Sequence, residues 1–258
     1  MIVLFFADVI GKPGRDLLIA RLPGLRERFG ADAVIANGEN VTDGTGLKPG
    51  HAEALLSAGV DVITTGNHVW RQRDIFRYLA EQPRVLRPYN FLDSNPGRGV
   101  TVVDTPGGRL GVINLLGDLY LYPARSPFEV VEQALEELHG VRNVIVDLHA
   151  EATSEKVAMG WHLDGRVSAV IGTHTHVRTA DARLLPRGTA YVTDAGMCGP
   201  RDSVIGVKKE LVLERFLSQL PVRFEVADTD VWLEGVVVEI DSDGHALRIE
   251  PFEAGSGS

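Results

Sequence analysis

Two histidines stand two residues apart behind an apolar run, in the segment VSAVIGTHTH that ends at His176. If the run forms a β-strand, side chains at positions i and i+2 leave the same face, so the imidazoles of His174 and His176 could converge on one site. Such a pair can bind a metal ion. It can also fill a loop without binding anything, because most histidines are surface groups or hydrogen-bonded core groups. The spacing alone leaves both interpretations open.

Other polar residues that can bind metal ions also follow apolar runs. Asp8 follows the run 2–7, Glu39 and Asn40 follow 33–36, Asn67 and His68 follow 61–65, and His149 follows 143–148. Asp8 or Glu39 could instead cap the next helix. Asn67 could stabilise a turn, and His68 could be a solvated loop residue. Open α/β sheets bind ligands at the carboxyl ends of their strands, however, so the shared placement favours one common site.

These residue types are compatible with one another as metal ligands. Two carboxylates, amide oxygens and three imidazoles form a mixed oxygen and nitrogen set that suits Mn, Fe or Zn, and the lack of thiolates disfavours soft metals. A single catalytic zinc usually takes three protein ligands, so this set is large enough for two ions. Two divalent cations would outweigh the charges of Asp8 and Glu39, and the site could attract phosphate although the protein is acidic.

The elements that must position these residues follow from the hydrophobic pattern. Apolar runs alternate with amphipathic helical stretches in the first half, which is typical of βαβ units and a mainly parallel sheet. We expect helices over 14–28, 49–57, 71–80, 126–138, 153–162 and 208–220. Further strands are expected at 167–172 and 189–194, with a hairpin over 99–116 that turns at Pro106. The segments 222–226, 231–240 and 246–252 predict an antiparallel meander.

Composition restricts the class of protein. The 258 residues contain no linker or repeat, so we expect one domain over 1–252 and a flexible tail over 253–258. No apolar stretch is long enough to cross a membrane, and the opening MIVLFFADVIG lacks the basic start of a signal peptide. A net charge of −9 argues against an extended nucleic-acid surface. Cys198 is the only cysteine, which excludes an internal disulfide and a thiolate zinc cluster and fits a cytoplasmic protein. The sequence leaves a homo-oligomer open.

The motifs resemble those of the calcineurin-like metallophosphoesterases, whose usual signature runs D-x-H, G-D, G-N-H-[DE], H and G-H-x-H. The chain departs from this signature, since Ile10 replaces the first histidine, Glu39 and Asn40 replace the aspartate of G-D, and Val69 follows Gly-Asn-His. The last motif carries an extra threonine. These departures resemble the YmdB-type branch, through ADVIGKPGR, NGENVTDGTGL, TTGNHVW, DLHAEATSEK, GTHTHVRTAD and DAGMCGP. The motifs span residues 7 to 200.

The resemblance implies an α/β fold, a four-layer αββα sandwich of two mixed sheets. It also implies a bacterial phosphodiesterase that acts on small 2′,3′-cyclic nucleotides with two metal ions, iron first and otherwise Mn, Zn or Mg. One ion would be held by Asp8, Glu39, Asn40 and His176. The other would be held by Asn67, His149, His174 and a bridging Glu39. Because Ile10 cannot bind a metal, the first ion would rely on Asn40.

The mechanism implied is attack by a metal-bridging hydroxide. Two metals about 3.5–4 Å apart lower the pKa of a bridging water and stabilise the charge of an in-line displacement. His68, next to Asn67 and free of metal in this scheme, is the general-acid candidate, because imidazole titrates near neutral pH. Weaker candidates for substrate contacts are Lys12, Arg15 and Cys198, each of which could equally be an ordinary structural residue.

Two alternatives stay open at the level of sequence. Within the enzyme class, the protein could be a phosphomonoesterase or a phosphodiesterase of broad specificity. In another class, it could be a regulatory protein that binds metal or nucleotide without turnover. The complete ligand set together with His68 argues against this second alternative.

Overall fold

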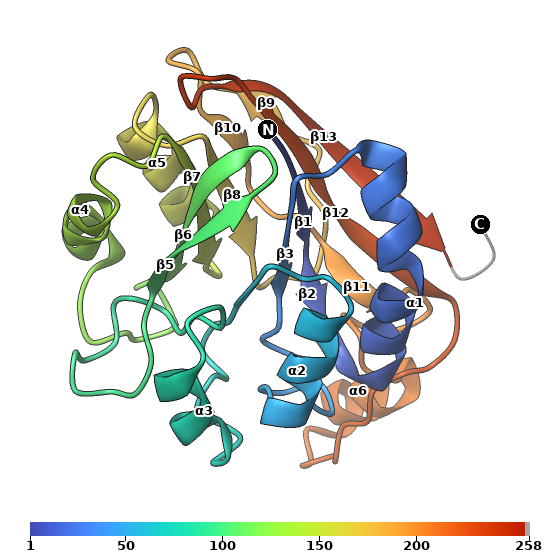
Figure 1. Ribbon diagram of the computed structural model, residues 1–258. Coiled ribbons are helices and arrows are strands. Elements are labelled where there is room, and N and C mark those ends of the chain that lie inside the picture. Colours follow the sequence, from blue (N-terminus) through green and yellow to red (C-terminus); the bar gives the residue numbers. More distant parts are fainter. Residues whose placement is uncertain (256–258) are drawn as a thin grey trace.

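The computed structural model of the protein describes residues 1–255. Two β-sheets lie face to face, and helices cover the outer face of each sheet (Figure 1). This arrangement confirms the four-layer αββα sandwich of two mixed sheets. Among the described residues, no helix combines the length and the apolar character that a membrane span requires.

The first sheet has seven strands in the order β2-β11-β12-β1-β3-β4, with β13 paired to β12. Its strands are β1 Ile2–Phe6, β2 Asp8–Val9, β3 Ala33–Asn37, β4 Val62–Thr64, β11 Met197–Pro200, β12 Val231–Ile240 and β13 Ala246–Gly255. β1, β3 and β4 run parallel, whereas β12 is antiparallel to β1. The carboxyl ends of β1, β3 and β4 therefore lie at one edge of the sheet.

The second sheet has six strands in the order β5-β6-β7-β8-β10-β9. Its strands are β5 Val100–Thr105, β6 Gly108–Leu116, β7 Asn143–His149, β8 Ala169–Thr173, β9 Arg183–Leu184 and β10 Ala190–Val192. The four central strands are parallel, and the two edge strands β5 and β9 are antiparallel to their neighbours. The expected hairpin is the β5–β6 pair.

Side-chain alternation in β1 shows how the layers form. Val3 and Phe5 belong to the apolar layer between the two sheets, whereas Leu4 and Phe6 belong to the layer between the first sheet and its helices. The outer helices of this sheet are α1 Gly11–Phe29, α2 Pro49–Ser57 and α3 Ile75–Glu81. Both faces of β1 are thus buried, as expected for a central strand of a parallel sheet.

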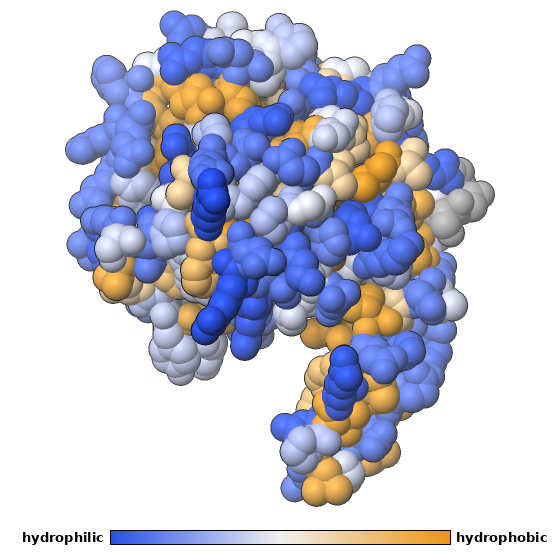
Figure 2. Space-filling model, turned by 60° about the horizontal axis from the view of Figure 1, so that its bottom comes forward, coloured by the Kyte–Doolittle hydropathy of each residue, from blue (hydrophilic) through white to orange (hydrophobic). Residues whose placement is uncertain are grey.

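The second sheet is covered by α4 Pro127–Glu137 and α5 Thr153–Leu163. Helix α4 lies within the range 126–138 that the sequence predicts, begins with Pro127 in its first turn and buries Val130, Val131 and Ala134. The last helix, α6 Lys209–Ser218, buries only Val212. It belongs to an arm that projects from the body and exposes apolar side chains (Figure 2).

Several boundaries differ from the predictions. Helix α1 begins at Gly11 rather than at residue 14, and α3 begins at Ile75 because residues 71–74 form turns. The strand predicted over 222–226 is wrong, since this segment makes only an isolated bridge through Val226. β13 runs to Gly255, beyond the expected domain end at 252, and residues 256–258 of the predicted tail lie outside the described residues.

Candidate metal centre

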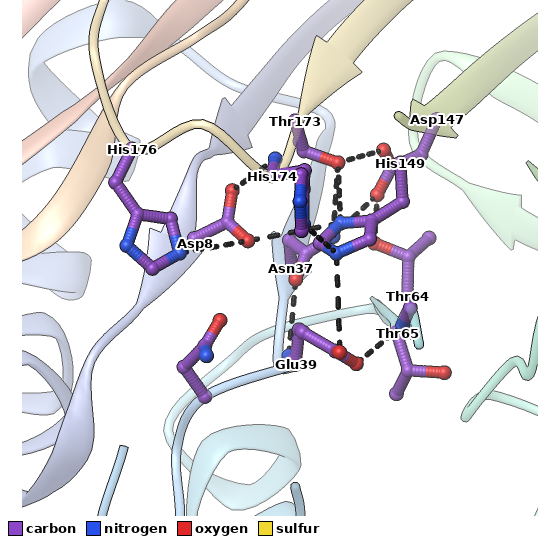
Figure 3. A network of polar contacts seen from close by, with 12 residues as sticks. Asp8, Asn37, Glu39, Thr64, Thr65, Asp147, His149, Thr173, His174 and His176 are labelled. Carbon is purple, nitrogen blue, oxygen red and sulfur yellow. Dashed lines mark hydrogen bonds and ion pairs between the residues drawn. The ribbon is translucent and has the colours of Figure 1, made fainter. Parts of the chain in front are cut away.

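The layer between the sheets is apolar until the strands reach their carboxyl ends, where it becomes polar. The inward-facing polar residues are Asn37 on β3, Thr64 on β4, Asp147 and His149 on β7, and Thr173 on β8. Each continues the alternation of apolar residues that face the opposite sheet, such as Ile35, Val62, Ile145 and Ile171. Figure 3 shows these side chains from both sheets pointing toward one another. The sandwich therefore brings polar groups from distant segments into one cluster.

Asp147 fixes the orientation of His149 through a buried network. The carboxylate accepts hydrogen bonds from Nδ2 of Asn37 (2.9 Å), Oγ1 of Thr173 (2.7 Å) and Oγ1 of Thr64. Burial raises the pKa of Asp147 to about 7, against the effect of these three hydrogen bonds. Since Thr173 gives its only hydroxyl proton to Asp147, it accepts the Nδ1–H of His149 at 3.0 Å. The other ring nitrogen, Nε2, keeps its lone pair and faces the centre.

Two further acceptor atoms lie close to this nitrogen. Nε2 of His149 lies 3.1 Å from Nδ1 of His174 and 3.2 Å from Oδ1 of Asn67. Nε2 of His174 lies 3.1 Å from a carboxylate oxygen of Glu151, so its proton is on that side and Nδ1 keeps a lone pair. Ligand nitrogens about 2.1 Å from one ion are about 3.0–3.4 Å apart. Nε2 of His149 thus lies from each of the other two atoms at the distance expected between ligands of one cation, and no proton lies between them.

A second group of acceptors surrounds Asp8. Nδ1–H of His176 donates to the carbonyl of Ile205 (2.9 Å), so Nε2 faces Asp8, 3.6 Å from its Oδ1. That carboxylate oxygen has no hydrogen-bond partner. Nδ2 of Asn40 donates to the carbonyl of Gly44 (2.8 Å), which leaves Oδ1 of Asn40 buried and without a partner as well. The structure thus brings together Asp8, Asn40 and His176, which the resemblance implies for the other ion.

Glu39 lies between the two groups. Its carboxylate accepts the backbone N–H groups of Gly66 (2.5 Å) and His68, and Oε1 lies 3.9 Å from Nε2 of His149. Burial raises the pKa of Glu39 well above its usual range, and the nearby charge of Asp8 adds to this effect. At Asp8, burial opposes ionisation, but His176 and His149 lower its pKa below the usual range.

The cluster fits divalent cations. Asp8 and Glu39 are almost completely buried, and within residues 1–255 only histidines form ion pairs with them. Buried carboxylates without cationic partners are costly, and a divalent cation would remove that cost. In the described part of the chain no three His, Cys, Asp or Glu side chains are already arranged to hold an ion. Each set instead depends on an amide oxygen, from Asn40 or Asn67.

The loop that carries the two histidines is strained and anchored. His174 and His176 have φ angles of 102° and 62°, which cost non-glycine residues about 1–3 kcal/mol each. Between them, Thr175 donates its N–H (3.1 Å) and its hydroxyl (2.8 Å) to Asp194, which is paired with Nζ of Lys156 at 2.8 Å. Both members of this ion pair are buried. The pair therefore holds the loop in its conformation.

Sequence reasoning missed Asp147, Lys156 and Asp194. Asp147 could have been found, because it precedes His149 by two residues and must share its strand face. Lys156 could also have been found, because it occupies the buried face of α5 together with Met159 and Leu163, where an apolar residue is expected. Asp194 could also have been noticed, because it ends the predicted strand 189–194 and begins the motif DAGMCGP, but its partners come from other elements and could not be predicted.

The centre opens into a cavity of about 270 Å³. Its lining includes Glu39, Asn40, His68, Glu151, His174, Thr175, His176 and Ile205. His68 stands in the wall, with Nδ1 buried and without a hydrogen bond although it lies 3.2 Å from Oε1 of Glu39. Burial, with a contribution from Arg71, lowers the pKa of His68 to about 4. The ring is therefore neutral at neutral pH, whereas the sequence predicted a group that titrates there.

The three weaker candidates lie elsewhere. Lys12 lines a different cavity together with Arg223, and Arg15 contacts Asp16 at 3.3 Å. Cys198 is completely buried, its Sγ–H donates to the carbonyl of Glu234 (3.2 Å), and burial raises its pKa above the usual range. The structure does not bring these side chains to the cavity of the metal centre.

Comparison with known proteins agrees with this architecture. The profile of a family described as "YmdB-like protein" matches residues 4–252. The chain belongs to this family. A relative from Bacillus subtilis (strain 168), named 2′,3′-cyclic-nucleotide 2′-phosphodiesterase, is 45% identical over 252 residues, covering 97% of this chain and 96% of that protein. The resemblance stated from the motifs is thereby confirmed.

Solved structures extend the comparison to three dimensions. A hypothetical protein from Thermus thermophilus superposes with a TM-score of 0.93 at 40% identity and covers 99% of both chains. A novel phosphatase from Mycoplasma pneumoniae gives a TM-score of 0.92 at 37% identity, over 99% of this chain and 93% of that one. An NAD nucleotidase from Haemophilus influenzae shares only the fold, with a TM-score of 0.61 at 11% identity.

Proposed function

We propose that this YmdB-like protein hydrolyses 2′,3′-cyclic nucleotides with the help of two metal ions. That it is a phosphoric ester hydrolase follows from its relatives, which are named phosphodiesterase and phosphatase. The observation that carries the metal-dependent part is the meeting of lone pairs at His149, His174 and Asn67, 3.1 Å and 3.2 Å apart. The substrate class is supported by the name of the Bacillus subtilis relative.

In this proposal the residues divide into two ligand sets. Asp8, Asn40 and His176 would hold one ion, and Asn67, His149 and His174 would hold the other. Glu39, whose carboxylate lies between the two sets, would contribute to both. When bound, divalent ions of the Fe, Mn, Zn or Mg type supply an activated water and neutralise the phosphoryl oxygens. The chain itself excludes bulk water from the inner side of the centre, where His149 and Asp147 are completely buried.

His68 is the proposed donor to the leaving oxygen. Because its ring is neutral, it acts by donating an N–H hydrogen bond as that oxygen gains charge, and the final proton comes from solvent. Water adds to phosphorus and one bond from phosphorus to a ribose oxygen breaks, which leaves a nucleoside monophosphate. We assign the bond to the 2′ oxygen, on the name of the Bacillus subtilis relative.

A phosphomonoesterase is the second candidate, favoured by the Mycoplasma pneumoniae relative that is described as a phosphatase. A panel of substrates separates the two. With Mn²⁺-loaded or Fe²⁺-loaded protein, we expect kcat/KM for 2′,3′-cyclic AMP to exceed that for 3′,5′-cyclic AMP and for 3′-AMP at least about tenfold, since each 1.4 kcal/mol of differential transition-state binding gives that factor. Faster hydrolysis of 3′-AMP would contradict the proposal in favour of a monoesterase.

A further inference from the structure

A second cavity of about 280 Å³ adjoins the metal centre. His176 lines both cavities, and so stands between them. The wall of the second cavity includes Met197 on β11, whose register partner in the neighbouring strand β2 is Asp8. This cavity therefore begins one strand away from a proposed metal ligand, on the other side of the His176 ring.

The wall of this cavity carries a flat cationic surface. The guanidinium of Arg201 lies over the ring of Trp232, 3.9 Å from its centroid. Ion pairs with Glu234 (3.1 Å) and Glu253 (2.8 Å) hold Arg201 in this position, while 37% of its side chain stays exposed. The planar guanidinium of Arg201, packed over the Trp232 ring, is a group on which a further aromatic ring system can stack.

The same cavity offers groups that recognise the edges of a heteroaromatic ring. Arg178 lines it and supplies N–H donors. Glu234 lines it too. Its side chain is 15% exposed, and its carboxylate accepts from Arg201 and from the N–H of Met197 (3.2 Å). Two carboxylate oxygens have about four acceptor positions, so Glu234 can accept further hydrogen bonds, for example from an exocyclic amino group. Donors, acceptors and a stacking plane are thus combined in one place.

We propose that the cavity formed by Arg178, Met197, Arg201, Trp232 and Glu234 binds the nucleobase of the substrate. The inference rests on the proposed function, because it takes the phosphate to lie at the metal centre. The phosphate then occupies the cavity lined by Glu39 and His68, the ribose passes His176, and the base stacks on the Arg201–Trp232 pair. Base–aromatic and base–guanidinium stacking tolerates every base, so the subsite distinguishes nucleotides from cyclic phosphates that lack a base.

The test compares 2′,3′-cyclic AMP with glycerol 1,2-cyclic phosphate, a cyclic diester without a base, on the full metal-loaded protein. In the variant Arg201→Ala we expect KM for cyclic AMP to rise about tenfold while kcat/KM for the base-free ester is unchanged. Arg201→Lys keeps the charge but loses the planar group, and it should raise KM as the alanine variant does. Arg166→Ala is the matched control, because Arg166 has the same 37% exposure and pairs with a glutamate, Glu132, away from both cavities.

Each outcome decides the proposal. An equal loss for both substrates in Arg201→Ala would place Arg201 at the phosphate and overturn the base subsite, as would full rescue by lysine or no effect at all. If the unmodified protein hydrolyses neither ester, the proposed function is wrong. Equilibrium binding of 3′-AMP by calorimetry then decides the subsite separately: tighter binding to the unmodified protein than to Arg201→Ala supports it, and equal binding overturns it.

Discussion

Most of the proposed ligand atoms are oriented by a hydrogen bond on the far side of the group that carries them. Thr173 receives the proton of His149, the carbonyl of Ile205 receives that of His176, and the carbonyl of Gly44 holds the amide of Asn40. Outer partners of this kind fix the tautomer and direction of a ligand and raise its basicity. The geometry of the centre therefore depends on these outer hydrogen-bond partners as well as on the ligands themselves.

The role of His68 can be tested at this scale. We expect His68→Ala to retain both metal ions and to slow turnover about 100-fold, and more for substrates with poor leaving groups, since a positioned donor matters most where charge develops on the leaving oxygen. Because the pKa of His68 is about 4, its ring is neutral above that pH. The ratio of unmodified to variant rates should therefore stay level from about pH 5.5 to about pH 8. A variant with undiminished turnover would remove His68 from the mechanism.

At the scale of elements, strand order and loop anchoring make the site. Parallel strands of two facing sheets end in the same place, and the strained loop after β8 is held by the buried pair of Lys156 from α5 and Asp194. This pair joins a helix, a strand end and the histidine loop. A change at Lys156 in α5, which is not itself a proposed ligand, should therefore reach the metal centre.

This coupling leads to a prediction for Lys156→Met. Removing one partner leaves the charge of Asp194 buried and unpaired, so we expect the free energy of unfolding to fall by about 3–5 kcal/mol. Urea unfolding measures this loss, and Asp194→Asn in the same chain should recover part of it. Lys208→Met is the control, because its pair with Glu225 has a similar distance of 2.7 Å but is exposed. Equal unfolding free energies for both lysine variants would show that the buried pair does not anchor the loop.

The sequence predicted the helices and strands better than the contacts between them. Ligand candidates could be placed from sequence because they follow apolar runs, and the carboxyl ends of parallel strands meet at one edge. The contact of Asn37 with Asp147 could not be placed, since it joins residues 110 apart through the packing of two sheets. The segment 222–226 has strand-like composition, but it pairs only through an isolated bridge between Val226 and Val207. Prediction from the local sequence pattern therefore failed where the structure depends on a partner residue that is far away in the sequence.

At the scale of the whole molecule, an acidic protein must bind an anionic substrate. The chain has a net charge of −9, and its two innermost site carboxylates add to the negative charge of the centre. Two divalent cations would reverse the sign of the local charge and leave the rest of the surface acidic. The neighbouring cavity adds Arg178 and Arg201, but both are paired with glutamates, so the positive charge stays at the metal centre. This charge distribution favours small phosphodiesters over long nucleic acids, which would meet the acidic surface.

The most direct test of the central claim measures metal content and turnover in the same samples, using elemental analysis and hydrolysis of 2′,3′-cyclic AMP. For protein purified without chelator, we predict two divalent ions per chain, loss of activity on chelation and recovery on addition of Mn²⁺ or Fe²⁺. The variant Asp8→Asn, which is close in size but carries no charge, should hold fewer ions and lose at least about 100-fold in rate. Unmodified protein that contains no transition metal, together with undiminished hydrolysis by Asp8→Asn, would contradict the account.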